Sequence, residues 1–347
     1  MICNEEYIST ALDIPVCYAQ NELVISSADD VVSYEYSEDG HLWLKTIKLE
    51  KCNRSELGGV LTFLKNLQSI SPYRILSDSS DRTLKTTVYH GCHLPLYISL
   101  DGTDLRLSYP ICKSGCVQEL LKPYFADGGL PENLVAAIFS RAVKSVCELH
   151  KAGWIHRALC SRHLLLNQLA QDKDSLDVSL CGLGSIAHVK PNGSCLNRTG
   201  LPVIDAGWRG WHYQNLLDTV YSTHPVAWYS PEMIAQDFQG YGEPSDIYSL
   251  GLTLGEMFTG IPPFVGTITP SCPPIPITPE MTMMMVMIVL LQPPNTTASA
   301  EMVSVFKQCT HFDPDRRPTA DELLQLPWIQ KGLSTPLTEA MLEPFRR

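Results

Sequence analysis

Halfway along the chain stands the segment Trp154-Ile155-His156-Arg157-Ala158-Leu159, directly after a long run of helical periodicity. Pro131-Glu132 suits the first turn of that helix, and Gly153 is placed to end it. Apolar residues in the run recur at spacings of three and four, the pattern of one helix face: Leu134, Ile138, Ala142, Val146 and Leu149. We therefore predict a long buried helix that leads into a short strand and a His-Arg turn.

On the N-terminal side of this helix the pattern is that of β-strands. One helical stretch, Glu56–Leu67, interrupts them. Two strand pairs are predicted, the first with a hairpin signal at Asp39-Gly40: Val31–Tyr36 with Leu42–Leu49, and Leu94–Leu100 with Leu105–Tyr109. An antiparallel sheet with one helix is expected here.

On the C-terminal side the pattern stays helical. A helix is predicted over Asp246–Phe258 with Gly260 just past its end, and Thr319-Ala320-Asp321-Glu322 is a capping box for another. The apolar run Met283–Leu291 is far shorter than the roughly 20 residues of a membrane span, which favours a buried helix. Irregular loops are predicted over Lys190–Trp211 and Gly260–Thr278.

Composition narrows the class of function. The 347 residues are 44% hydrophobic and 18% charged, as in globular proteins. The net charge of −11 argues against a nucleic-acid partner or an acidic membrane surface. The twelve cysteines form no CxxC pair, and Met1–Thr10 lacks the apolar stretch of a secretory signal. We expect free thiols in a reducing cytoplasm, and no zinc site.

Four motifs then stand in the order and spacing of the protein kinases, which the chain resembles: His156-Arg157 after the long helix, Ser230-Pro231-Glu232, Asp246–Gly251 and Asp313–Thr319. Within that family the chain is most similar to the sterile-twenty-related adaptor (STRAD) pseudokinases. The likeness lies in His156-Arg157 without a following Asp, in Ser161–Leu165, and in Phe238–Tyr241 leading into Ser245–Ser249.

The resemblance implies an α+β, two-lobed protein-kinase-like fold. It has a small antiparallel-sheet lobe with one helix and a larger, mainly helical lobe. The expected division is an N-terminal extension over 1–20, an N-lobe over 21–112, a C-lobe over 113–331 and a C-terminal tail over 332–347.

By the same resemblance, the catalytic groups are replaced. The catalytic Asp falls on Ala158, the metal-binding Asn on His163, and the metal-binding Asp of Asp-Phe-Gly on Gly182. A methyl group cannot act as a base, and imidazole is a poor ligand for Mg²⁺. No glycine precedes Gly40, so the loop that covers phosphates is missing too. We predict a pseudokinase rather than an enzyme, with no catalytic residue, metal or required cofactor.

Other family positions are kept. Lys45 matches the nucleotide-binding lysine, although a strand lysine taken alone is more often solvated; its glutamate partner falls on Leu61, with Glu56 nearby but out of register. The resemblance also implies two structural contacts. Glu232 pairs with Arg317, and Asp246 accepts backbone hydrogen bonds from the turn at His156 and Arg157.

The function implied is that of an allosteric adaptor. Such pseudokinases bind and activate a partner serine/threonine kinase, the liver tumour-suppressor kinase, and help retain it in the cytoplasm, with the nucleus as a second compartment. A helical-repeat scaffold protein assists them, but its Trp-Glu-Phe docking tail is not matched by Leu342–Arg347. Two alternatives stay open: a pseudokinase that binds ATP without turning it over, and a weakly active kinase that uses Lys45. The tryptophans in Gly207–Trp211 fit either a binding hot spot or packing against the large lobe.

Overall fold

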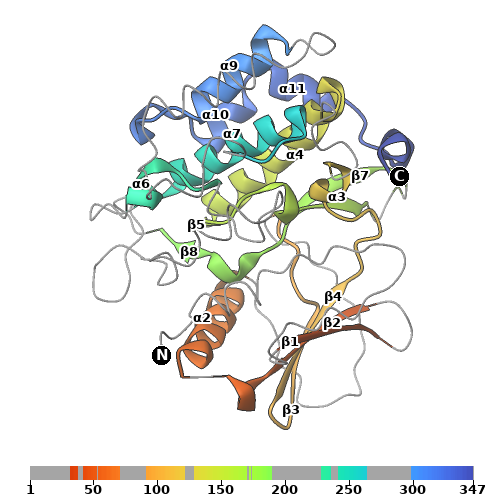
Figure 1. The fold of residues 1–347 in the computed structure, drawn as a ribbon, viewed down its shortest axis with the longest axis vertical. Helices are drawn as coiled ribbons and strands as arrows, with labels where there is room; N and C mark the ends of the chain where they lie inside the picture. Colours follow the sequence, from red (N-terminus) through yellow and green to blue (C-terminus); the bar gives the residue numbers. More distant parts are fainter. Residues whose placement is uncertain are drawn as a thin grey trace, which may run out of the picture.

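The computed structural model describes residues 32–37, 42–52, 54–70, 91–121, 129–169, 172, 174–189, 228–235, 241–263 and 298–346. Within these residues a sheet with one helix forms one end of the molecule and a bundle of helices forms the other (Figure 1). Several predictions lie outside the described residues: the extension 1–20, the turn Asp39-Gly40, the loop Lys190–Trp211 with its tryptophans, and the helix Met283–Leu291.

The small lobe contains a four-stranded sheet in the order β1-β2-β4-β3, with every neighbouring pair antiparallel. Its strands are β1 (Val32–Tyr36), β2 (Leu42–Lys48), β3 (Tyr97–Asp101) and β4 (Asp104–Pro110). Alternate residues of β4 are buried, as expected for a sheet with one face on the core. Both predicted strand pairs are confirmed.

Helix α2 (Arg54–Ile70) follows β2 by way of the short turn η1 (Leu49–Lys51). Its buried residues recur at helical spacing: Val60, Phe63, Leu67 and Ile70. Asn66 Nδ2 donates to the carbonyl of Ile186 at 3.1 Å, so α2 also touches the segment after Gly182 in the large lobe.

Helix α4 (Glu132–Lys151) runs through the centre of the large lobe, and the five residues of its predicted apolar face are all buried. Helix α7 (Glu243–Thr259) begins three residues before the predicted start, because Pro244 is favourable in a first turn. It ends at Gly260, whose φ of 70° lies in the left-handed region. The remaining helices are α3 (Val117–Leu121), α6 (Pro231–Ala235), α9 (Ala300–Cys309), α10 (Ala320–Leu324), α11 (Pro327–Ser334) and α12 (Glu339–Leu342).

Two short antiparallel strand pairs lie in the segment between α4 and α6. Strand β5 (Trp154–Ile155) pairs with β8 (Ala187–His188), and β6 (Leu164–Gln168) pairs with β7 (Leu176–Leu180). The turns η3 (Ser161–His163) and η4 (Leu183–Ser185) lie between these strands. The predicted strand and His-Arg turn are therefore confirmed, and the pairing brings residues 156–163 next to residues 181–186.

The last described residues pack against the large lobe and the segment that follows β4. Leu176 N donates to the Leu337 carbonyl at 2.8 Å, and Leu342 is fully buried. Arg346 Nη2 donates to the carbonyl of Ser114 at 3.1 Å. The C-terminus accordingly lies beside α3 and β7 (Figure 1). In the described part of the chain, no helix combines the length and apolar character of a membrane span.

Candidate functional site

The turn after β5 is held by one buried carboxylate. Asp246, 1% exposed near the start of α7, accepts from the backbone N–H of His156 at 2.7 Å and of Arg157 at 2.8 Å. Its Oδ2 also lies 2.9 Å from His150 Nε2. Burial raises the pKa of Asp246, but the hydrogen bond and charge of His150 outweigh it and hold that pKa below its usual value. The carboxylate thus stays ionised and fixes the turn.

Arg157 has a backbone φ of 64°, in the left-handed region that side chains other than glycine rarely adopt. Such a conformation persists only where the surroundings determine it. Here the Asp246 carboxylate binds the peptide N–H on each side of His156, and Arg157 Nη1 donates to Tyr241 Oη at 3.0 Å. The His-Arg turn is therefore a fixed part of the fold.

His163 and Gly182, which match the two metal ligands of the kinases, lie against each other. A Cβ atom built on Gly182 would meet His163 Cδ2 at 2.6 Å and Nε2 at 2.7 Å. Gly182 also has a φ of 75°, which disfavours any side chain. His163 is fully buried, and its Nδ1 lies 2.5 Å from the carbonyl of Ala158. The imidazole fills the space that a side chain at position 182 would need.

These residues do not fit Mg²⁺, which requires oxygen ligands in near-octahedral geometry. Gly182 offers no side chain, and His163 offers a ring whose Nδ1 is already engaged by the Ala158 carbonyl. Elsewhere in the described residues, no group of three or more His, Cys, Asp or Glu side chains is placed to hold a metal ion.

Ala158, at the catalytic Asp position, is 1% exposed and brings only a methyl group. Its neighbour His156 accepts from the Ala158 N–H through Nδ1 at 3.3 Å, and His156 Nε2 lies 2.8 Å from the Cys181 carbonyl. Burial, with the nearby His163, lowers the pKa of His156 to about 4. His156 is therefore neutral at pH 7, and its ring serves to connect the two halves of the loop.

Glu256 on α7 is a second buried carboxyl at the site, and its role was not predicted. Its Oε1 accepts from Ser161 Oγ at 2.7 Å and its Oε2 from Trp228 Nε1 at 3.1 Å. Burial raises the pKa of Glu256 to about 7, although both hydrogen bonds oppose the rise. Glu256 thereby ties η3 to the segment that enters α6.

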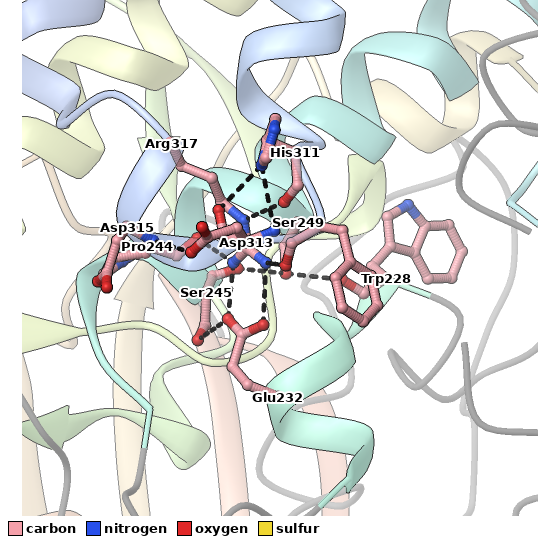
Figure 2. A network of polar contacts seen from close by, with 10 residues as sticks. Trp228, Glu232, Pro244, Ser245, Ser249, His311, Asp313, Asp315 and Arg317 are labelled. Carbon is pink, nitrogen blue, oxygen red and sulfur yellow. Dashed lines mark hydrogen bonds and ion pairs between the residues drawn. The ribbon is translucent and has the colours of Figure 1, made fainter. Parts of the chain in front are cut away.

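Glu232 and Arg317 form a two-point ion pair, with Nη1–Oε1 at 2.6 Å and Nη2–Oε2 at 2.9 Å. Ser245 Oγ also donates to Glu232 Oε1 at 2.7 Å (Figure 2). Arg317 completes its five donors on three backbone carbonyls, those of Pro244, His311 and Phe312. Burial raises the pKa of Glu232, but Arg317 outweighs burial and lowers it. The pair joins α6, the start of α7 and the segment before α10.

Lys45 lies in the centre of the sheet rather than at the surface. It stands on β2 opposite Leu107 of β4 and is only 2% exposed. Lysine is rarely buried unless its charge is compensated. Lys45 therefore differs from the usual lysine in a strand, which is solvated. Leu61, which matches the family's glutamate position on α2, is 60% exposed and faces solvent.

Buried thiols also border the site, in a cluster of Cys112, Cys116 and Cys181 with Leu165. Burial raises the pKa of Cys112 to about 12 and that of Cys181 well above its usual value. The described cysteines are free thiols, as expected. Because the thiolate is the reactive form, these two side chains act as apolar packing rather than as nucleophiles.

The structure thus brings most of the predicted site residues into one region, around the loop between β5 and β8. It adds Glu256, which no sequence motif singled out. A polar residue inside the apolar run of α7 was the one available signal for Glu256.

Comparison with known proteins gives a family and relatives. The family model described as "Protein kinase domain" matches residues 96–329. The chain is 32% identical over 164 residues to STE20-related kinase adapter protein beta of Mus musculus, covering 47% of this chain and 34% of the relative. It is 25% identical over 262 residues to the alpha protein of Rattus norvegicus, covering 75% of this chain and 56% of the relative.

A third relative has the name of an enzyme. Serine/threonine-protein kinase pakG of Dictyostelium discoideum is 26% identical over 248 residues, covering 70% of this chain and 17% of the relative. The chain therefore spans only part of each relative. The two-lobed protein-kinase fold and the resemblance to the sterile-twenty-related adaptors are confirmed.

Proposed function

We propose, for a chain that belongs to the protein kinase family, the role of a pseudokinase adaptor that binds a partner kinase and does not itself transfer phosphate. One group of relatives is named as kinase adapters and another relative is named as a protein kinase. The names of the relatives therefore do not decide between an adaptor and an enzyme. The replaced residues in the loop support the first.

The observation that carries the proposal is the packing of Ala158, His163 and Gly182. Phosphoryl transfer depends on a base that orients the hydroxyl and on metal ions that neutralise developing charge. Loss of a general base alone costs about 10²–10⁴ in rate. Here the base position has a buried methyl group, and His163 occupies the space next to Gly182. The catalytic base and the metal ligands are thus replaced by residues that pack in the core of the loop.

The adaptor role follows from what the fold keeps. Asp246 and the Glu232–Arg317 pair hold the large lobe in a defined shape, which suits a surface that another protein recognises. By the adaptor resemblance, the partner is a serine/threonine kinase, the liver tumour-suppressor kinase, activated and retained in the cytoplasm. Activation by binding is a population shift, and a preference of about 10⁴-fold for the active form turns a 1:99 mixture into 99:1.

A helical-repeat scaffold protein is a further partner of this proposal. The segment Leu342–Arg347 does not match Trp-Glu-Phe, so we do not expect this segment to dock on the scaffold. Leu342 is moreover buried against the protein's own large lobe.

A phosphotransfer assay tests the absence of catalysis. The purified chain and its Lys45→Ala variant are incubated with labelled ATP, with and without Mg²⁺, and with a general substrate protein. We expect no transfer above background from either protein. Transfer at ordinary enzyme rates that disappears in Lys45→Ala would establish the weakly active kinase instead.

An activation assay tests the adaptor role. The purified chain is titrated into the liver tumour-suppressor kinase while phosphorylation of a peptide substrate is followed. We expect a saturable rise in kcat/KM that Lys45→Ala preserves, because the rise comes from binding and not from chemistry in this chain. An unchanged rate at saturating chain, with no complex in size-exclusion chromatography, would contradict the proposal.

A second candidate function is ATP binding without turnover, favoured by the burial of Lys45 in the sheet. Because Gly182 and His163 do not fit Mg²⁺, any stabilisation by ATP should be the same with the metal and without it. Thermal unfolding with ATP, with ATP and Mg²⁺, and with the Lys45→Ala variant gives the answer. A shift in Tm that requires Mg²⁺ would contradict this form of binding.

A further inference from the structure

Three aromatic residues stand in a row across the sheet of the small lobe. In the strand register, Trp43 of β2 lies opposite Tyr36 of β1 on one side and opposite Tyr109 of β4 on the other. Residues directly opposite each other in an antiparallel sheet project from the same face. The rings of Tyr36 and Trp43 make an edge contact, with centroids 4.8 Å apart. Trp43 and Tyr109 are buried, so this aromatic row is part of the core.

His93 extends the aromatic row to the large lobe. Its ring stacks on that of Tyr109, with 5.8 Å between the centroids and 11° between the ring planes. The backbone N–H of His93 donates to the carbonyl of Leu180 on β7 at 2.7 Å. Burial lowers the pKa of His93 to about 4, so the ring is neutral at pH 7 and packs as an aromatic group. The row therefore reaches from β1 to the strand that leads into Gly182.

The aromatic row lies on the face of the sheet that carries Lys45. Side chains two positions apart in a strand point to the same side, so Trp43 and Lys45 share a face. Further neighbours of Lys45 on that face are Ile47 along β2 and Leu107 across on β4, and both are buried. A ligand held by Lys45 would lie against this same face, where these apolar side chains already pack.

The indole of Trp43 resembles the group that such a ligand would bring. It is a planar bicyclic ring, as a purine base is, and it makes the edge contacts that aromatic rings prefer. We propose that the Trp43 indole is a built-in substitute for a ligand base: it takes the place beside Lys45 that a planar base would need, and it stabilises the small lobe without any nucleotide. This role of Trp43 is independent of the adaptor function. It opposes ATP binding, the second candidate function, because a base cannot enter while the indole is in place.

Thermal unfolding of the full chain gives the first test. Wild type is compared with and without ATP, adenine and indole at constant ionic strength, in the presence and absence of Mg²⁺. We expect no change in Tm, since a ligand that bound only the folded state would raise it. A saturable rise with ATP that Lys45→Ala abolishes would overturn the proposal, because a nucleotide would then bind with Trp43 in place.

Trp43→Ala gives the second test, because it should open the place that the indole fills. Truncation of a core tryptophan leaves a cavity, so Tm should fall by about 6–20 °C. Indole and adenine should each enter this cavity and raise the Tm of the variant by about 3–6 °C at a tenfold excess over Kd. Trp328→Ala is the matched control, since Trp328 is 6% exposed in the large lobe, and adenine should leave its Tm unchanged.

Two results in the variants would also overturn the proposal. One is the absence of any rise with indole and adenine in Trp43→Ala, which would show that the indole fills no space that a planar ring can use. The other is an equal rise with adenine in Trp43→Ala and Trp328→Ala, which would make the binding unspecific. If Trp43→Ala does not fold, Trp43→Leu leaves a smaller cavity in the same place, and the same results in that variant would have the same meaning.

Discussion

Two arginines of the large lobe are buried almost equally, Arg317 at 6% exposure and Arg162 at 8%, yet their surroundings are opposite. Arg317 has a carboxylate and three carbonyls on its five donors, in the network of Figure 2. Arg162 has a buried Nε for which the described part of the chain provides no acceptor. The difference separates a fully bonded framework from the loop formed by residues 156–163 and 181–186. This loop is called the incomplete loop here, because Arg162 leaves a donor unsatisfied among the described residues.

The largest expected effect is on the complete region. Arg317→Met leaves Glu232 buried without its partner and should lower the free energy of unfolding by about 3–5 kcal/mol. Urea denaturation measures the loss. Arg316→Met is the matched control, because the Arg316 side chain is 72% exposed and should change stability by less than about 0.5 kcal/mol. If Arg317→Met does not fold, Glu232→Gln is the milder variant to measure. A loss below about 1 kcal/mol in the variant that is measured would contradict a stabilising role for the Glu232–Arg317 pair.

The second prediction concerns Glu256, which lies beside the incomplete loop. Its pKa is raised from 4.5 to about 7 in the folded state, so between these values the folded state holds a proton that the unfolded state has lost. Stability from this group is present below pH 4.5 and decreases as pH rises toward 7. In Glu256→Gln the amide can accept from Trp228 and donate to Ser161. The variant should therefore gain about 3 kcal/mol relative to wild type between pH 4.5 and 7.

Two histidines act in the opposite direction in the same pH range. Burial lowers the pKa of His93 and of His156 from 6.5 to about 4, so their contribution to stability is lost as pH falls from 6.5 to 4. For this reason the difference between variant and wild type has to be followed, and not the wild-type curve alone. Urea denaturation at a series of pH values gives that difference, and a difference that does not change with pH would refute the raised pKa.

The third prediction tests whether the two altered metal positions are coupled. Gly182→Asp places a Cβ within 2.6 Å of the His163 ring and should cost about 1–3 kcal/mol from overpacking. Gly102→Asp is the matched control, since Gly102 has a similar φ of 61° with nothing within 4 Å. The excess loss at 182 over 102 isolates the steric clash. Adding His163→Asn to Gly182→Asp should recover most of that excess, and no recovery in the double variant would show that the two positions are independent.

Much of the framework could be predicted from the sequence because its signals are local. The apolar face of α4, the two strand pairs and the capping box at Thr319 depend on residues a few positions apart. The pairing of Glu232 with Arg317, 85 residues apart, was expected only through the resemblance to a known family. Local patterns therefore gave the elements, and the family gave their long-range contacts.

The incomplete loop could not be predicted in the same way. From sequence, His163 and Gly182 look like two separate losses of metal ligands. Only the packing shows that the His163 ring fills the space that a side chain at position 182 would need. Glu256 meets Ser161 across 95 residues, and no motif marks that contact. Whether a charge such as that of Arg162 is paired depends on all the segments that surround it. From sequence, a lysine in a strand is predicted to be solvated, whereas Lys45 is buried.

The smallest effect is expected where the two regions meet, at Tyr241. Its hydroxyl accepts from Arg157 Nη1 at 3.0 Å, and Tyr241→Phe removes this hydrogen bond while keeping the ring. A loss of about 0.5–1.5 kcal/mol is expected, the usual net value of a hydrogen bond to a buried group. The left-handed backbone of Arg157 should survive, because the Asp246 carboxylate fixes the turn independently. Urea denaturation measures the loss, and amide hydrogen exchange at residues 156 and 157 reports the turn. Exchange that becomes fast in Tyr241→Phe would show that the turn depends on the side chain of Arg157, and the His-Arg turn would then belong to the incomplete loop and not to the framework.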